Sequence, residues 1–222
     1  MVRRCYKRAM SKLVLSLFIV AVGISVSAKE AIGPAAEVDM VLAKYRKAKA
    51  IRARVKKTVI QEVMGSESQS HGNFYFSKGK LRLDIIEPEK TTLVYDGKFV
   101  WLESRMDTLV SVTKIAADGL KKSDSLLAAL FEKKGILNTF KLLSKKIDGS
   151  AKVYVFEPKD KSNTEVQYLE LSLKGTDLGR VTYRDQVENK ISFEFEKLIR
   201  ASVAASKFKY KPPQGAQVTE IK

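Results

Sequence analysis

Residues 91–103 read TTLVYDGKFVWLE and contain the strongest hairpin signal in the chain. Two runs of apolar and aromatic residues, 91–95 and 99–103, flank the pair Asp96-Gly97. Asp-Gly is favoured in tight hairpin turns because both residue types tolerate a positive φ. The stretch therefore predicts two antiparallel strands joined by a short turn.

Alternation of apolar and polar residues continues on both sides of this hairpin. A long strand is predicted over 51–63, with Val63 on its apolar face and charged residues on the other face. Further short strands are predicted at 72–76, 81–85, 108–113, 153–156, 169–173 and 191–195. Many short strands separated by turn signals predict an antiparallel barrel or a curled sheet.

Two segments have helical spacing instead of alternation. The first opens with Pro34 and places Val38, Val41, Leu42 and Tyr45 on one face. The second begins near Ser123-Asp124 and carries the apolar residues Leu126, Leu127, Leu130 and Phe131. A shorter helical stretch is predicted at 203–205. Two helices are too few for a bundle, so we expect them to cover one mouth or face of the sheet.

The first 28 residues have the features of a secretory signal peptide. Five basic residues precede the uncharged run 13–24, and Val26-Ser27-Ala28 forms a small-x-small cleavage site. We expect cleavage after Ala28, with translation starting at Met1 or Met10, and a single domain over 29–222. The segment 1–28 takes five of the 41 basic side chains and no acidic one, which leaves 36 against 25, a net charge of +11.

The residue inventory excludes several kinds of active site. The chain has one cysteine, Cys5, and one histidine, His71, so cysteine zinc clusters and multi-histidine metal sites are excluded. It contains no phosphate-binding glycine-rich motif of either common type. We interpret His71 as a solvated or capping residue. An enzyme is possible at this point but no motif supports one, and we expect no cofactor and no metal. The lysines are scattered along the chain, which favours a solvated surface, with weak attraction to anionic membranes or acidic proteins as the functional alternative.

The chain also carries more large apolar side chains than a small closed barrel needs. One interpretation is an ordinary core, and the other is a cavity between the sheet and a helical lid that holds an apolar ligand. Composition does not choose between the two.

Two motifs and their order give the chain a family resemblance. The first is the DGKxxW element at 96–101, and the second is the FxYxPPxG element at 208–215. Together with Gly72-Asn73-Phe74 and Pro88, they resemble the LolA family of periplasmic outer-membrane lipoprotein carriers across residues 37–221. The resemblance implies a mainly β fold with an α lid, a half-open antiparallel β-barrel that encloses an apolar cavity covered by short helices.

The resemblance also implies a function and site residues. A carrier of this family binds the acyl chains of lipoproteins that an inner-membrane ABC-type complex releases, and delivers them to an outer-membrane receptor. It is expected to have no enzymatic activity, to be monomeric, to lie in the periplasm and to bind no nucleic acid. The resemblance assigns to the acyl-chain cavity Phe74, Phe76, Leu81, Leu83, Ile85, Leu93, Trp101, Leu126, Leu130 and Phe131.

This sequence departs from the family pattern at three places. The hairpin that usually carries an Arg-Pro pair reads Ser77-Lys78-Gly79-Lys80, so Lys78 and Lys80 are the expected lid latch. Lysine keeps the charge of arginine but lacks its planar fork of donors. Leu83 stands where a tryptophan is common, and the turn 185–189 lacks its glycine.

Three alternatives stay open at this stage. The first is a LolA-like periplasmic carrier of another lipid, such as a glycolipid or a free fatty acid. The second is a regulator of the RseB type, which binds an anti-sigma factor and shares this architecture in its first domain. The third is a hydrolase, which a screen on ester substrates would detect.

Overall fold

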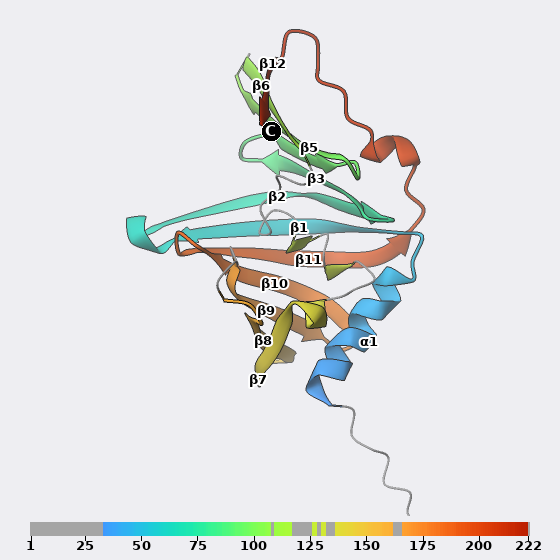
Figure 1. Ribbon diagram of the computed structural model, residues 1–222, viewed down its shortest axis with the longest axis vertical. Coiled ribbons are helices and arrows are strands. Elements are labelled where there is room, and N and C mark those ends of the chain that lie inside the picture. The colour runs from blue at the N-terminus through green and yellow to red at the C-terminus, as the bar shows by residue number, and fades with distance from the viewer. Residues whose placement is uncertain are drawn as a thin grey trace, which may run out of the picture. The chain divides into compact units, whose positions relative to one another are not determined.

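Twelve strands form one open sheet in the part of the chain that the structure describes, which is residues 33–107, 109–116, 126–127, 130–131, 136–161 and 166–221 of a computed structural model (Figure 1). The strands are β1 (Ala50–Gln61), β2 (Ser66–Ser77), β3 (Lys80–Glu87), β4 (Thr91–Tyr95), β5 (Phe99–Met106), β6 (Leu109–Ala116), β7 (Phe140–Asp148), β8 (Ala151–Pro158), β9 (Val166–Lys174), β10 (Asp177–Asp185), β11 (Asn189–Ala201) and β12 (Gln217–Ile221). The signal peptide predicted over 1–28, its cleavage site and Thr108 lie outside the described residues.

The strand order explains how two halves of the chain share one sheet. The order is β12-β6-β5-β4-β3-β2-β1-β11-β10-β9-β8-β7. Two antiparallel meanders, β1 to β6 and β7 to β11, meet where β1 pairs with β11 over almost its whole length. The strands at the two ends of this order, β12 and β7, do not pair with each other. The mainly β, half-open architecture predicted from the sequence is therefore confirmed.

The Asp-Gly hairpin forms as predicted between β4 and β5. Gly97 has a φ of +98°, and the Asp96 carboxylate accepts hydrogen bonds from the backbone N–H groups of Lys98 and Phe99 at 2.8 and 2.9 Å. Burial of Asp96 raises its pKa, but the hydrogen bonds from these two N–H groups and from the indole of Trp101 lower it by more. The pKa of Asp96 therefore lies below its usual value. The side chain of Asp96 thus fixes the turn.

Helix α1 (Pro34–Arg46) begins at the predicted proline, with Gly33 at its N-cap. Its side chains Val38, Val41, Leu42 and Tyr45 are buried in the core, as the spacing predicted. In the second predicted helix, Leu126, Leu127 and Leu130 are helical, while its expected start at 123–124 is outside the described residues. Among the described residues, no helix has both the length and the apolar character needed to cross a membrane.

The sequence did not predict β7, β10 and β12. Bulges break the alternation in β7 near Leu142 and in β10 near Leu178, and β7 is rich in lysine. The short strand β12 is exposed and pairs parallel to β6, so no periodic apolar pattern marks it.

Two local predictions were wrong. Val63 does not continue the apolar face of β1, because the chain turns through the 3-10 helix η1 (Glu62–Met64) and leaves this side chain 80% exposed. The short helix expected at 203–205 is instead the 3-10 helix η4 (Ala205–Phe208). A third 3-10 helix, η3 (Ile136–Asn138), precedes β7.

Candidate functional site

The register of strands β2 to β4 gathers the predicted apolar residues on one face of the sheet. Phe74 lies opposite Leu83, and Phe76 lies opposite Leu81; Leu83 in turn lies opposite Leu93. Directly opposed residues of antiparallel strands point to the same side of the sheet. We call this side the inner face. The first four side chains are buried, and Leu93 and Ile85 are partly buried against them.

The second half of the sheet continues the inner face. Val55 pairs with Phe195 across the centre, and the pairs Val181–Phe193 and Leu171–Val181 carry the face onward to β9. Sequence reasoning left this half out of the site, although alternation in 169–173 and 191–195 had marked its strands. The buried inner-face residues of β8 to β11 include Tyr154, Phe156, Leu169, Leu171, Leu173, Val181, Tyr183, Ile191, Phe193 and Phe195.

A short helical segment covers the inner face. Its described residues Leu126, Leu127, Leu130 and Phe131 are all buried, and we call these four residues the cover. The ring of Phe131 lies 5.8 Å from that of Phe74 and 5.3 Å from that of Phe76, measured between centroids. The cover therefore packs directly on the sheet residues that the sequence had assigned to the same cavity.

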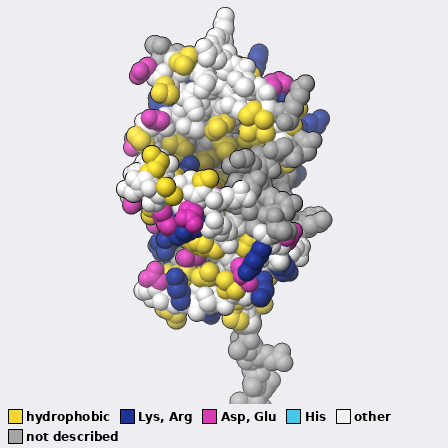
Figure 2. Space-filling view, turned by 60° about the vertical axis from the view of Figure 1, so that its left-hand side comes forward, with side chains coloured by type: hydrophobic (Ala, Val, Ile, Leu, Met, Phe, Trp, Pro, Cys, Tyr) yellow, Lys and Arg dark blue, Asp and Glu magenta, His cyan; other side chains and the backbone are white. Residues whose placement is uncertain are grey.

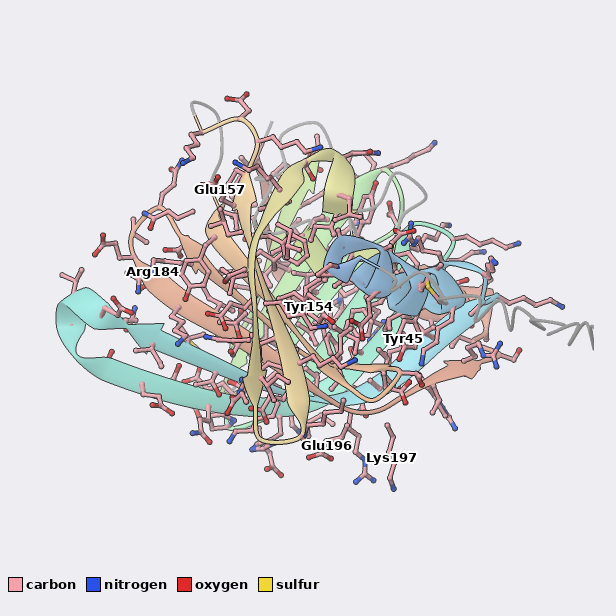
Figure 3. The ribbon with its side chains drawn as sticks, turned by 90° about the horizontal axis from the view of Figure 1, so that it is seen from below. Tyr45, Tyr154, Glu157, Arg184, Glu196 and Lys197 are labelled. Atoms are coloured by element: carbon pink, nitrogen blue, oxygen red, sulfur yellow. The ribbon has the colours of Figure 1, made fainter. Side chains whose placement is uncertain are left out.

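Helix α1 is tied to the other half of the sheet by polar contacts. Glu37 accepts hydrogen bonds from Lys152 at 2.5 Å, from Tyr154 at 2.5 Å and from Lys145 at 3.0 Å. These three donors lower the pKa of Glu37 to about 2. At the far end of the helix, the Tyr45 hydroxyl donates to Asp177 at 2.8 Å. In Figure 3, Tyr45 and Tyr154 lie within the curve of the sheet, while Glu196 and Lys197 point away from it.

Trp101 does not belong to the inner face, and its assignment to the cavity was wrong. Because Leu93 pairs with Leu102 and Val94 pairs with Trp101, the indole points to the opposite, outer face. There its Nε1 donates to Asp96 at 3.1 Å. The alternation had predicted the strand correctly, but it does not say which of its two faces is buried by the cover.

A C-terminal strap, residues 202–216, crosses the outer face between β11 and β12. The Tyr210 ring packs on Trp101, and the Tyr210 hydroxyl donates to the buried carboxylate of Glu103 at 2.5 Å. Lys207 lies 3.8 Å from Asp84. The FxYxPPxG element that carried the resemblance is therefore part of this strap.

The expected latch residues lie at the turn between β2 and β3. Lys78 has a φ of +48°, and both Lys78 and Lys80 are exposed. Within the described part of the chain, neither ammonium group forms a hydrogen bond or ion pair, with the cover or elsewhere. The latch stays a prediction, because most of the segment around the cover lies outside the described residues.

Hollows on the outer face of the described residues are lined largely by charged side chains. One is lined by Arg54, His71, Glu87 and Glu196, and His71 is exposed, as expected for a solvated histidine. The described residues include no group of three or more acidic, histidine or cysteine side chains that could hold a metal ion. The inner face is therefore the surface suited to an apolar ligand.

Burial of apolar surface is the chemistry that the inner face can offer. Each CH₂ group removed from water contributes about 0.8 kcal/mol, without any directional requirement. In this structure the cover occupies the face. A ligand of several CH₂ groups must therefore displace the cover and replace its contacts.

Comparison with known proteins agrees with this geometry. The family model described as "Outer membrane lipoprotein carrier protein LolA" matches residues 46–211. An outer-membrane lipoprotein carrier protein from Neisseria meningitidis serogroup C is 31% identical over 153 residues, covering 67% of this chain and 71% of the relative. One from Dechloromonas aromatica is 25% identical over 186 residues, covering 83% of this chain and 88% of the relative.

A solved structure shows the same fold at lower similarity. The crystal structure of an uncharacterized conserved protein from Thermus thermophilus has a TM-score of 0.50 at 14% identity, covering 85% of this chain and 100% of that chain. The fold, the apolar inner face with its cover and the family match over residues 46–211 together show that this chain belongs to the LolA family.

Proposed function

We propose that this protein is a periplasmic carrier that binds the acyl chains of lipoproteins and delivers them to the outer membrane. Its cargo would come from an inner-membrane ABC-type releasing complex and pass to an outer-membrane receptor. The signal peptide would direct export and be cleaved after Ala28. Family membership and the names of the relatives support a lipoprotein carrier; the route of delivery is part of the proposal.

The observation that carries the proposal is the inner face with its small, separate cover. The sheet residues form a continuous apolar surface from β4 to β8, and the four residues of the cover pack on it. The four described cover residues belong to none of the twelve strands, so no strand-to-strand hydrogen bond of the sheet depends on them. The cover would therefore open without unfolding the sheet.

The energetics of an acyl chain fit this arrangement. Exposing a lipid chain to water costs about 0.8 kcal/mol of free energy for every CH₂ group. Such a chain therefore cannot cross an aqueous compartment unshielded. Binding exchanges contacts between cover and sheet for contacts between acyl chain and sheet. Because the same surface is buried in both states, the net affinity is smaller than the acyl burial alone, which makes later release possible.

Handover must be driven by binding differences. No nucleotide-binding motif is present in the sequence, so this chain is not expected to couple release to hydrolysis. A receptor can take the cargo if it binds the acyl chains more tightly. It can also do so if docking opens the cover and lowers the affinity of the carrier.

A release assay tests this proposal. Purified protein that begins at Lys29 is added to spheroplasts, and newly made lipoproteins are sought in the soluble fraction, bound to it. We expect release by the wild type and loss of release for Leu93→Glu, which puts a charge on the half-buried edge of the inner face.

The matched control is Val110→Glu. Val110 is also half-buried and apolar, but it lies opposite Arg105 on the outer face of the β5–β6 hairpin. It should keep release. Equal release by both variants would contradict the inner face as the binding surface. The wild type could also fold, release no lipoprotein and yield another lipid on solvent extraction. That result would identify this lipid, rather than lipoproteins, as the cargo.

A further inference from the structure

The turns of the first meander carry opposite charges at its two ends. Each strand of an antiparallel meander reverses direction, so successive turns lie alternately at one end and the other. The connections before β1, between β2 and β3, and between β4 and β5 share one end. Their exposed lysines are Lys47, Lys49, Lys78, Lys80 and Lys98. We call this the basic end.

Acidic side chains outnumber the exposed basic ones, Lys90 and Arg105, at the alternate turns. The β1–β2, β3–β4 and β5–β6 connections and their flanks carry the exposed residues Glu62, Glu67, Glu87, Glu89 and Asp107. In Figure 1 the tip of the β1–β2 hairpin lies at the left, and the basic end lies at the right, where β1 begins. Figure 2 turns the left-hand side forward and shows acidic, basic and apolar side chains interspersed on it. The exposed lysines in the turns of the first meander therefore lie mainly at one end, with Lys90 as the exception at the other.

Other segments strengthen the basic end. Because Ala50 pairs with Ala201, the end of β11 with Arg200 lies there too. The strap follows directly and contributes the exposed residues Lys207 and Lys209. These positions extend the positive surface from the turns onto the adjoining strap.

The described carboxylates at the basic end are already engaged. Asp96 accepts hydrogen bonds from its own turn and from the Trp101 indole. Asp177 is paired with Lys44, and Asp148 lies 3.8 Å from Arg180. Among the described residues, no ion pair or hydrogen bond is formed by the ammonium groups of the five turn lysines. Apart from a longer-range attraction between Lys80 and Asp96, their charge therefore faces solvent.

We infer that the basic end docks this protein on anionic phospholipid surfaces. The turns there are short and polar, reading KAK at 47–49, SKGK at 77–80 and DGK at 96–98, and they contain no large apolar side chain. The cores of protein interfaces are depleted in lysine and enriched in aromatic residues. Exposed lysines at several turn tips instead suit a diffuse negative surface, to which each contributes about 1 kcal/mol. The inference does not depend on what the inner face binds.

Co-sedimentation with lipid vesicles tests the inference. Protein that begins at Lys29 is mixed with phosphatidylcholine vesicles containing either no phosphatidylglycerol or one third of it, at low salt. We expect binding only to the anionic vesicles, with strong weakening as salt is added. The triple variant Lys47→Gln/Lys49→Gln/Lys98→Gln should bind about a hundredfold more weakly, since about 1 kcal/mol per lysine is lost and 1.4 kcal/mol is tenfold.

The control variant removes the same net charge from the opposite end. Lys90 and Lys161 lie in the β3–β4 and β8–β9 connections, and Lys190 is the second residue of β11, next to the β10–β11 turn. Their triple glutamine variant should keep wild-type vesicle binding. Equal loss in both triple variants would contradict the inference, because net charge alone would then explain binding. Failure of the wild type to bind anionic vesicles would overturn the inference. It would be overturned in that case even if the basic end were found to bind an acidic protein.

Discussion

The indole ring of Trp101 lies against the phenol ring of Tyr210, with ring centroids 5.4 Å apart. These residues belong to the DGKxxW and FxYxPPxG elements, the two motifs on which the family resemblance rested. Both therefore act on the outer face, where they hold the strap to β5. The motifs that identify the family are structural here, while the apolar face that we propose as the binding surface has a much less distinctive sequence.

Tyr210→Phe tests the attachment of the strap. The change keeps the ring on Trp101 but removes the donor to Glu103, whose side chain is buried and then has only Arg105 at 2.5 Å. A lost hydrogen bond to a buried charged group costs about 1.5–3 kcal/mol, so the free energy of unfolding should fall by that amount in urea titrations. Tyr75→Phe is the control. The Tyr75 side chain contacts the strap through its ring, which lies under the Lys207 ammonium, and this contact does not use the hydroxyl. Equal losses in both variants would contradict the role given to Tyr210.

Gly72→Ala should destabilise the sheet through its backbone. A Cβ atom at this position would lie 2.1 Å from the carbonyl oxygen of Asp84, at the bulge where β2 meets β3. No flexible side chain can move aside there, so we expect a loss of about 1–3 kcal/mol in the free energy of unfolding. Gly179→Ala should be tolerated, because its Cβ would meet mainly the flexible Lys174 side chain at 3.3 Å. Thermal unfolding of the two variants side by side decides the matter.

The sequence predicted strands better than it predicted faces. The period of two placed Phe74 and Phe76 on one side of their strand, and the structure confirms it. The same period places Trp101 with Glu103, but nothing local shows that a strap from the C-terminus covers this side. Which face is inner depends on contacts between residues far apart in the chain, so alternation alone could not assign it.

The second half of the site was missed for a different reason. Inner-face residues such as Leu171 and Phe193 alternate clearly, but β10 between their strands carries a bulge near Leu178 that breaks the pattern. Without β10, the two strands have no visible partner and no reason to join the first meander. Their membership in one face follows only from the pairing of β1 with β11.

Glu37→Gln should remove part of the acid sensitivity of folding. The pKa of Glu37 is lowered from 4.5 to about 2 by Lys152, Tyr154 and Lys145, so its carboxylate stabilises the fold fully above about pH 4.5. That stabilisation is lost as the pH falls to about 2. The difference in urea midpoint between wild type and Glu37→Gln should therefore be large at pH 6 and small near pH 2. Asp39→Asn, which removes a carboxylate paired with Arg46 of the same helix, is the matched control. A pH-independent gap for Glu37→Gln would contradict the account.

Phe131→Ala tests whether the cover competes with the ligand. Loss of its contacts with Tyr45, Phe74 and Phe76 should make opening easier, so a fluorescent fatty acid should bind more tightly. Phe208→Ala removes an equally buried ring from the strap, outside the core cluster. Both variants should lose about 3–5 kcal/mol of stability, but only Phe131→Ala should gain affinity. A gain in both would mean that general loosening, rather than the cover, controls binding.

Site-specific cross-linking tests the central claim most directly. A photoreactive amino acid is placed at Leu93 on the inner face or at Val110 on the outer face, and the protein is irradiated with a lipoprotein that carries labelled acyl chains. We predict that label transfers to the protein at Leu93, that unlabelled fatty acid competes it away, and that Val110 stays unlabelled. Equal labelling at both positions, or labelling at Val110 alone, would contradict an inner face that holds the acyl chains.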